Sequence, residues 1–158
     1  MNLQQVEVKV YCRPAADAVD PESYIAIFHR WIQENRLGRD FLLIDVADYR
    51  HVPDGPGVMI IAHGAHWKLD EAGGELGLAF ARKRDPLGPA ADKLTEAFTW
   101  ALRAAAALEK EPALAGKLSF RTDRVRVAVI SRAAAAGTPE DFAALRPDLE
   151  ALAARLWP

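Results

Sequence analysis

Apolar and polar residues alternate at the start of the chain, a pattern typical of a strand with one buried face. In residues 6–12, VEVKVYC, the side chains of Val6, Val8, Val10 and Cys12 share one face, and the residues between them share the other. We expect a half-buried strand here, with Cys12 in the core.

Three further extended stretches follow, over residues 40–50, 58–63 and 76–82. Apolar side chains recur in each of them, and the turn sequences Pro53-Asp54-Gly55 and Gly73-Gly74 lie between them. Proline and aspartate favour a tight turn, and glycine adopts the backbone angles that such turns require. The pattern predicts a three-stranded antiparallel meander.

Helical spacing of apolar residues appears three times. The first helix should begin at Asp20-Pro21-Glu22, which supplies an N-cap and a proline at the first helical position, and should end near Leu37-Gly38. A second should lie between Pro89 and Pro112. The third should start at residues 138–141 with an apolar stripe, and a proline inside it should kink or split it. The stripe comprises Phe142, Leu145, Leu149, Leu152 and Leu156, and the proline is Pro147.

Two more strands are expected between the second and third helices, in KLSF and RVRVAVI on either side of Thr122-Asp123. The element order is then β-α-β-β-β-α-β-β-α, with no linker long enough to divide residues 1–158. We therefore expect a single α+β domain with a curved, largely antiparallel sheet of about six strands and two to three helices on one face.

Composition narrows the classes of function. The 158 residues carry a formal net charge of −2, so no overall field attracts nucleic acid or an anionic membrane surface. No segment has the length and apolar character of a membrane helix or a signal peptide. The single cysteine, Cys12, rules out an intrachain disulfide framework. We expect a cytoplasmic protein without nucleic-acid or membrane partners.

Three of the four histidines fall in one segment, RHVPDGPGVMIIAHGAHWKLD. His63 and His66 have opposite parity in a regular strand, but a bulge at Gly64-Ala65 would bring both imidazoles to one face. His51, or Asp70, could then complete a site with an open position for zinc or another divalent metal. The alternative is that these are ordinary surface or half-buried strand histidines.

The same segment also suggests a ligand pocket. Trp67 and Tyr49 would form an apolar wall, while His66 or Arg82 would orient a small organic or anionic ligand. Two basic clusters would add a positive patch if their strands were neighbours, or would serve only as charged sheet edges. The clusters are Arg82-Lys83-Arg84 and the group Arg121, Arg124 and Arg126.

Two resemblances bear on the fold. The segment VPDGPGVMIIAH…LD followed by GLAFARKRD resembles a family of uncharacterised bacterial proteins without an established activity. The element order is similar to that of GyrI-like and SOUL-type ligand-binding domains, and this resemblance implies one curved sheet under two helices.

Three functions are therefore open. The chain is expected to be a non-catalytic module that binds a small molecule. The alternatives are a metal-dependent enzyme that uses His51, His63 and His66, and an interaction protein that forms a homodimer through a sheet edge or through the stripe of its last helix.

Overall fold

The computed structural model describes residues 3, 5–13, 19–84, 87–130 and 137–158. It contains six strands and three α-helices, and it confirms the predicted α+β class. The elements in chain order are β1 (Val6–Cys12), α1 (Pro21–Glu34), β2 (Leu43–Tyr49), β3 (Gly57–Ala62), β4 (Ala65–Asp70), β5 (Gly77–Arg82), α2 (Ala90–Glu109), a short 3-10 helix (Pro112–Leu114), β6 (Phe120–Val129) and α3 (Pro139–Leu156).

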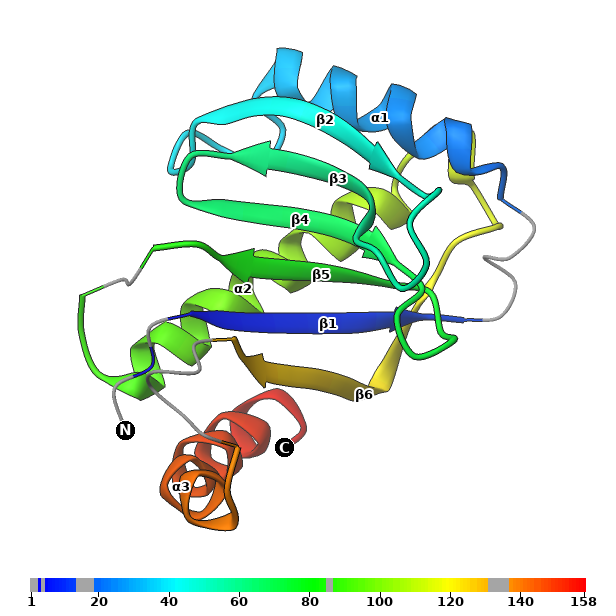
Figure 1. Cartoon of the computed structure of the whole chain (residues 1–158). Coiled ribbons are helices and arrows are strands. Elements are labelled where there is room, and N and C mark those ends of the chain that lie inside the picture. Colours follow the sequence, from blue (N-terminus) through cyan, green and yellow to red (C-terminus); the bar gives the residue numbers. More distant parts are fainter. Residues whose placement is uncertain (1–2, 4, 14–18, 85–86, 131–136) are drawn as a thin grey trace.

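All six strands belong to one antiparallel sheet in the order β2-β3-β4-β5-β1-β6 (Figure 1). The N-terminal strand is therefore interior, hydrogen-bonded to β5 on one side and to β6 on the other. The meander from β2 to β5 needs only short connections, whereas the chain crosses the sheet by way of α1 to reach β2.

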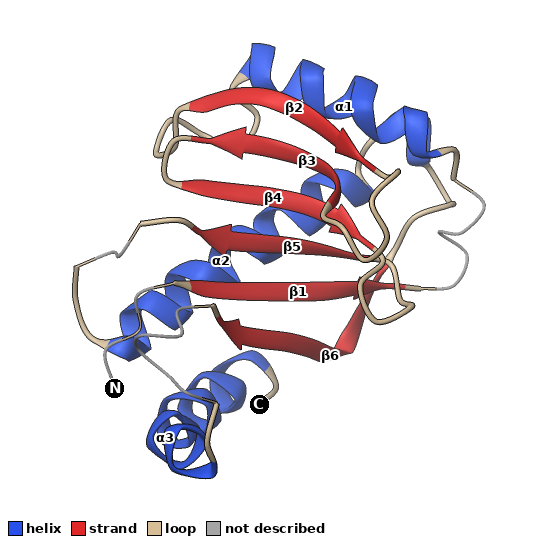
Figure 2. Ribbon diagram, viewed as in Figure 1, coloured by secondary structure: helices blue, strands red, loops and turns tan. Residues whose placement is uncertain are grey.

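Helices α1 and α2 pack on the same face of the sheet (Figure 2). Helix α1 contacts β2 and β3, and α2 contacts β1 and β5. Paired residues of four neighbouring strands point their apolar side chains toward these helices and form the centre of the core. These residues are Val8, Phe80, Trp67 and Ile60.

None of the described helices covers the central strands on the opposite face, and we call it the open face (Figure 1). Alternation along the strands places charged and small side chains there. They are Glu7 and Lys9 of β1, His66, Lys68 and Asp70 of β4, Ala79 and Ala81 of β5, and Arg126 of β6.

The six strands are distributed differently from the expected order. Four strands lie between α1 and α2, because the chain reverses at His63-Gly64. That reversal pairs Ile60 with Trp67, so that both side chains reach the core. Residues Phe120–Val129 form one strand rather than two. The pairing of this strand with β1 shifts in register between Val10 and Cys12, as at a β-bulge.

The helix ends follow local chemistry. Asp20 caps α1 as predicted, because its carboxylate accepts a hydrogen bond of 3.0 Å from the Glu22 N–H. The helix ends earlier than expected, at Glu34, since Asn35 takes the left-handed cap conformation that we assigned to Gly38. Helix α3 runs through Pro147 as one helix, so the proline does not split it.

Candidate functional site

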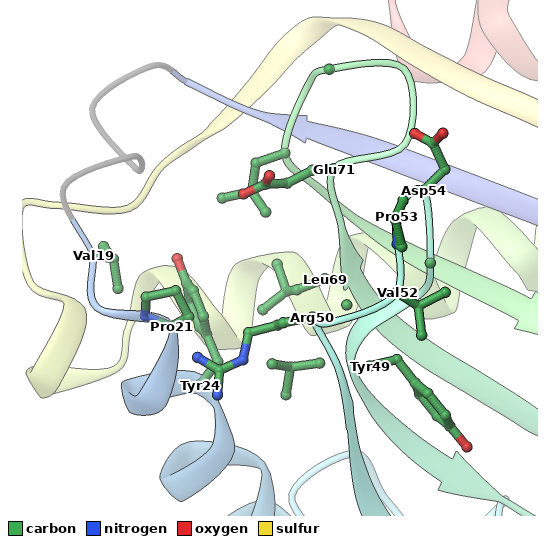
Figure 3. A pocket seen from close by; sticks show the side chains of 15 residues that line it. Val19, Pro21, Tyr24, Tyr49, Arg50, Val52, Pro53, Asp54, Leu69 and Glu71 are labelled. Atoms are coloured by element: carbon green, nitrogen blue, oxygen red, sulfur yellow. The ribbon is translucent and has the colours of Figure 1, made fainter.

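One cavity lies at one end of the sheet, between the start of α1 and the β2–β3 and β4–β5 loops (Figure 3). Its volume is about 710 Å³, within the range of small-molecule sites. We call it the loop cavity. Its lining comprises Val19, Pro21, Tyr24, Tyr49, Arg50, Val52, Pro53, Asp54, Gly55, Gly57, Val58, Leu69, Glu71, Gly74 and Leu76.

The inner wall of the loop cavity is apolar and fixed by the sheet. Val58 and Leu69 are directly opposite each other in the β3–β4 ladder, and both are buried. Gly57 permits this close approach, because a Cβ atom there would lie 1.9 Å from the carbonyl oxygen of Leu69. The glycine thus sets where the β2–β3 loop leaves the sheet.

One side of the loop cavity is closed by a charged cross-link. The guanidinium of Arg50 donates to both carboxylate oxygens of Asp48, at 2.8 and 2.5 Å, and to Glu22 at 2.7 Å. This tie joins the end of β2 to the first turn of α1. The side-chain hydrogen bond from Arg50 lowers the pKa of Asp48 to about 2. Because two carboxylates already compensate Arg50, the described lining of the cavity offers no uncompensated cation to an anionic ligand.

A second site lies on the open face, in a cavity of about 470 Å³ that adjoins one of about 350 Å³. The two cavities share Glu7, Pro56, Lys68 and Ile130, and the β2–β3 loop borders both. We call the larger one the open-face hollow. Its lining comprises Gln5, Glu7, Pro56, Met59, His66, Lys68, Ala81, Arg82, Lys83 and Ile130.

Ion pairs with buried carboxylates lie in and beside the open-face hollow. Glu7 is almost fully buried, and its two oxygens lie 2.6 Å from Lys68 Nζ and 3.4 Å from Arg126 Nη1. Lys9 and Asp70 form a second buried pair at 2.5 Å. Buried ion pairs contribute little net stability, because desolvation offsets their attraction. Such a cluster is therefore a candidate for a functional role.

His66 lines the hollow with a partly buried imidazole. Burial lowers the pKa of its imidazole, and the positive charges of Lys83 and Lys68 lower it further. The imidazole is therefore neutral near pH 7. Its Nδ1 atom is buried and has no hydrogen-bond partner among the described residues.

The structure separates the predicted pocket residues. His66 and Arg82 line the open-face hollow, and Tyr49 lines the loop cavity with its hydroxyl directed away from Arg50 (Figure 3). Trp67 lines neither. It is fully buried on the helix-covered face, in edge-to-face contact with Phe41, Phe80 and Trp100. Adjacent residues of a strand project to opposite faces, so Trp67 and His66 cannot line one pocket.

The guanidinium of Arg82 also lies away from the open face. It is 3.5 Å from the Glu96 carboxylate on α2 and stacks over the ring of Phe41 at 5.0 Å. Arg82 thus contributes to the rim of the hollow without presenting its charge there. Its neighbour Lys83 has the parity of the open face, and Lys83 Nζ donates to the carbonyl oxygen of Ala62 at 3.1 Å.

The predicted metal ligands do not converge. His51 lies in the β2–β3 loop and His63 in the β3–β4 turn, at opposite ends of β3, a strand of six residues or roughly 20 Å. Instead of a bulge at Gly64-Ala65 there is a chain reversal, and Asp70 is occupied by Lys9. Within the described part of the chain, no group of three or more His, Cys, Asp or Glu side chains could hold a metal ion.

The two basic clusters do not form a joint patch. Strand β1 lies between β5 and β6, and Arg82 and Arg124 lie at opposite ends of these strands. Arg121 pairs with Asp123, and Arg124 pairs with Glu75 and stacks on Tyr11. Arg121 and Arg124 therefore place charged side chains along the edge strand β6, which discourages pairing with another chain.

Two surfaces bear on the predicted self-association. Leu145 and Leu152 of the α3 stripe are buried in the core cluster, while Phe142 at its start is 60% exposed. On the edge strand β2, Ile44 is 55% exposed and Leu42, just before it, is 70% exposed. Part of the α3 stripe is thus used within the fold, and the β2 edge keeps exposed apolar side chains.

No family model, curated protein or solved structure matches the chain. The resemblances to uncharacterised bacterial proteins and to GyrI-like and SOUL-type domains therefore stay predictions. None of the described helices combines the length and apolar character needed to cross a membrane.

Proposed function

We propose that the protein is a non-catalytic module that binds a small neutral organic molecule in the loop cavity. The observation that carries this proposal is a cavity of about 710 Å³ with a preformed apolar inner wall, whose lining also includes the charged side chains of Arg50, Asp54 and Glu71. Val58 and Leu69 supply the wall, and Leu76 extends it along the β4–β5 connection.

The charge distribution disfavours an anionic ligand. Arg50 is already bound by Asp48 and Glu22, and the lining adds the carboxylates of Asp54 and Glu71, so an anion would gain little there.

The test uses a neutral fluorescent dye, Nile red, as probe. The parent protein should raise its emission, and Leu76→Trp should abolish this by filling the cavity. Leu87→Trp places the same substitution at a fully exposed position and serves as the matched control. The proposal fails if Leu76→Trp folds normally and still binds the dye as the parent does.

A second candidate function is self-association of two copies through β2. It is favoured by the exposed Ile44 on the edge strand and by the exposed Leu42 just before it, since free sheet edges pair readily with another chain. Light scattering after size-exclusion chromatography would test it: a dimer should become monomeric in Leu42→Lys, Ile44→Lys. A monomeric parent protein would exclude this function.

A further inference from the structure

We propose that the open-face hollow is a second, separate binding site, specific for a small organic acid whose carboxylate contacts Lys83, Lys68 and His66. This proposal is independent of the proposed function of the loop cavity, because the hollow and the loop cavity share no lining residue. Three observations carry it: the local charge, an unpaired buried imidazole nitrogen, and apolar walls beside them.

The local charge is positive. Glu7 is the one carboxylate among the described residues that line the hollow, and Lys68 and Arg126 already hold both of its oxygens. Among the described residues, Lys83 Nζ hydrogen-bonds to the neutral carbonyl oxygen of Ala62 and to no carboxylate. Its charge is therefore uncompensated within the hollow, and an ammonium group in partly buried surroundings gains most from an anion.

His66 provides a directional partner. Its imidazole lies in the same row of the sheet as Ala81 and Glu7, across the small side chain of β5. The buried Nδ1 atom has no hydrogen-bond partner among the described residues, although buried polar atoms of this kind are normally satisfied. A carboxylate oxygen at Lys83 would accept a hydrogen bond from Nδ1–H in that tautomer.

The remaining lining suits an apolar body. Met59 and Ile130 line the hollow, Pro56 lines it from the β2–β3 loop, and Ala81 lies between the side chains of β1 and β4. No described arginine directs its guanidinium into the hollow, so the bidentate fork that favours phosphate is missing. A carboxylate with a short hydrocarbon chain fits this combination.

The experiment is a calorimetric titration with hexanoate, accompanied by NMR of the histidine side chains. Hexanoate should bind and shift the His66 imidazole signals, and butyrate should bind more weakly because it covers less of the apolar wall. Hexanol and hexylammonium, which lack the anion, should not bind. Equal binding of hexanol, tighter binding of inorganic phosphate, or unchanged His66 signals would each overturn the proposal.

Two variants and two controls locate the site. Lys83→Met should weaken hexanoate binding about tenfold, the value of a charged hydrogen bond, whereas Lys117→Met changes an exposed lysine outside the hollow and should have no effect. Ile130→Ser, at a half-exposed position, should weaken hexanoate more than butyrate. Leu76→Trp should leave hexanoate binding intact, which separates this site from the loop cavity. An unchanged affinity in both Lys83→Met and Ile130→Ser would refute the assignment.

Discussion

Lys9 Nζ and Asp70 Oδ1 lie 2.5 Å apart in the interior of the open face, although β5 separates the strands to which they belong. The same ammonium group donates to the carbonyl oxygens of Ala72 at 3.2 Å and Glu75 at 2.8 Å. All the donor protons of Lys9 are thus used. This single side chain connects β1 to β4 and to the β4–β5 loop.

Replacing Lys9 with methionine should therefore be strongly destabilising. Asp70 would remain buried, and Lys68 Nζ, at 3.8 Å, is too distant to hydrogen-bond to it. We expect the free energy of unfolding in urea to fall by about 3–5 kcal/mol. The double variant Lys9→Met, Asp70→Leu should recover much of this loss, because it removes the unpaired charge. As a control, Arg146→Gln breaks an exposed pair with Glu150 and should cost less than about 1 kcal/mol.

A second prediction concerns the core under α1. Trp31 is fully buried, and its indole N–H donates to Glu111 at 2.5 Å. Trp31→Ala should lower the free energy of unfolding by about 3–5 kcal/mol through lost burial and the cavity left behind. Trp31→Phe keeps most of the packing but removes the donor, and should cost about 1–3 kcal/mol. A loss below about 1 kcal/mol for the alanine variant would contradict this packing.

Much of the fold could be predicted because its signals are local. The alternation in VEVKVYC defines β1, and the chemistry of Asp20 and Thr138 defines where two helices begin. The reversal at His63-Gly64 was missed, since these residues lack the Asn-Gly or Asp-Gly pairs that mark tight hairpins. Without that turn, β3 and β4 read as one irregular strand.

The candidate sites were harder to predict, because their residues meet through tertiary pairing. Alternation assigns Glu7 and Lys9 to the polar face of a strand, and it cannot distinguish a face in water from one covered by loops. The partner of Lys9 is 61 residues away along the chain. For Trp67 the parity argument was available from the sequence: as a neighbour of His66 in an extended segment, it had to point to the other face.

Gly57 and Gly73 allow a matched comparison of steric and conformational effects. Both have positive φ, +62° and +79°, but a Cβ at Gly57 would collide with the backbone of Leu69, whereas among the described residues no atom lies within 4 Å of one at Gly73. Gly73→Ala should cost about 1 kcal/mol, from backbone strain alone. Gly57→Ala should cost more than about 3 kcal/mol, because β3 and β4 must separate. If both variants lose the same free energy of unfolding in urea, strands β3 and β4 separate at Gly57 at little cost, which would contradict this prediction.

The pH dependence of stability should report on His66. Burial and the charges of Lys83 and Lys68 lower the pKa of this imidazole below its ordinary value of about 6.5, while the Glu7 carboxylate on the same face is held by Lys68 and Arg126. The unfolded chain therefore takes up a proton at this position at a higher pH than the folded chain does. The contribution of neutral His66 to the free energy of unfolding is fully present above about pH 6.5, and it is lost as the pH falls toward the pKa of His66 in the folded chain.

Urea unfolding midpoints measured from about pH 7.5 down to about pH 5 should thus decrease, and the decrease should be smaller in His66→Gln. His63→Gln removes a histidine from the exposed β3–β4 turn and controls for the loss of an imidazole as such. An NMR titration of the folded protein gives the His66 pKa directly. A pKa at or above about 6.5 would contradict the prediction that burial and the two lysines lower the pKa of His66. A pH dependence of the midpoint that is unchanged in His66→Gln would contradict it as well.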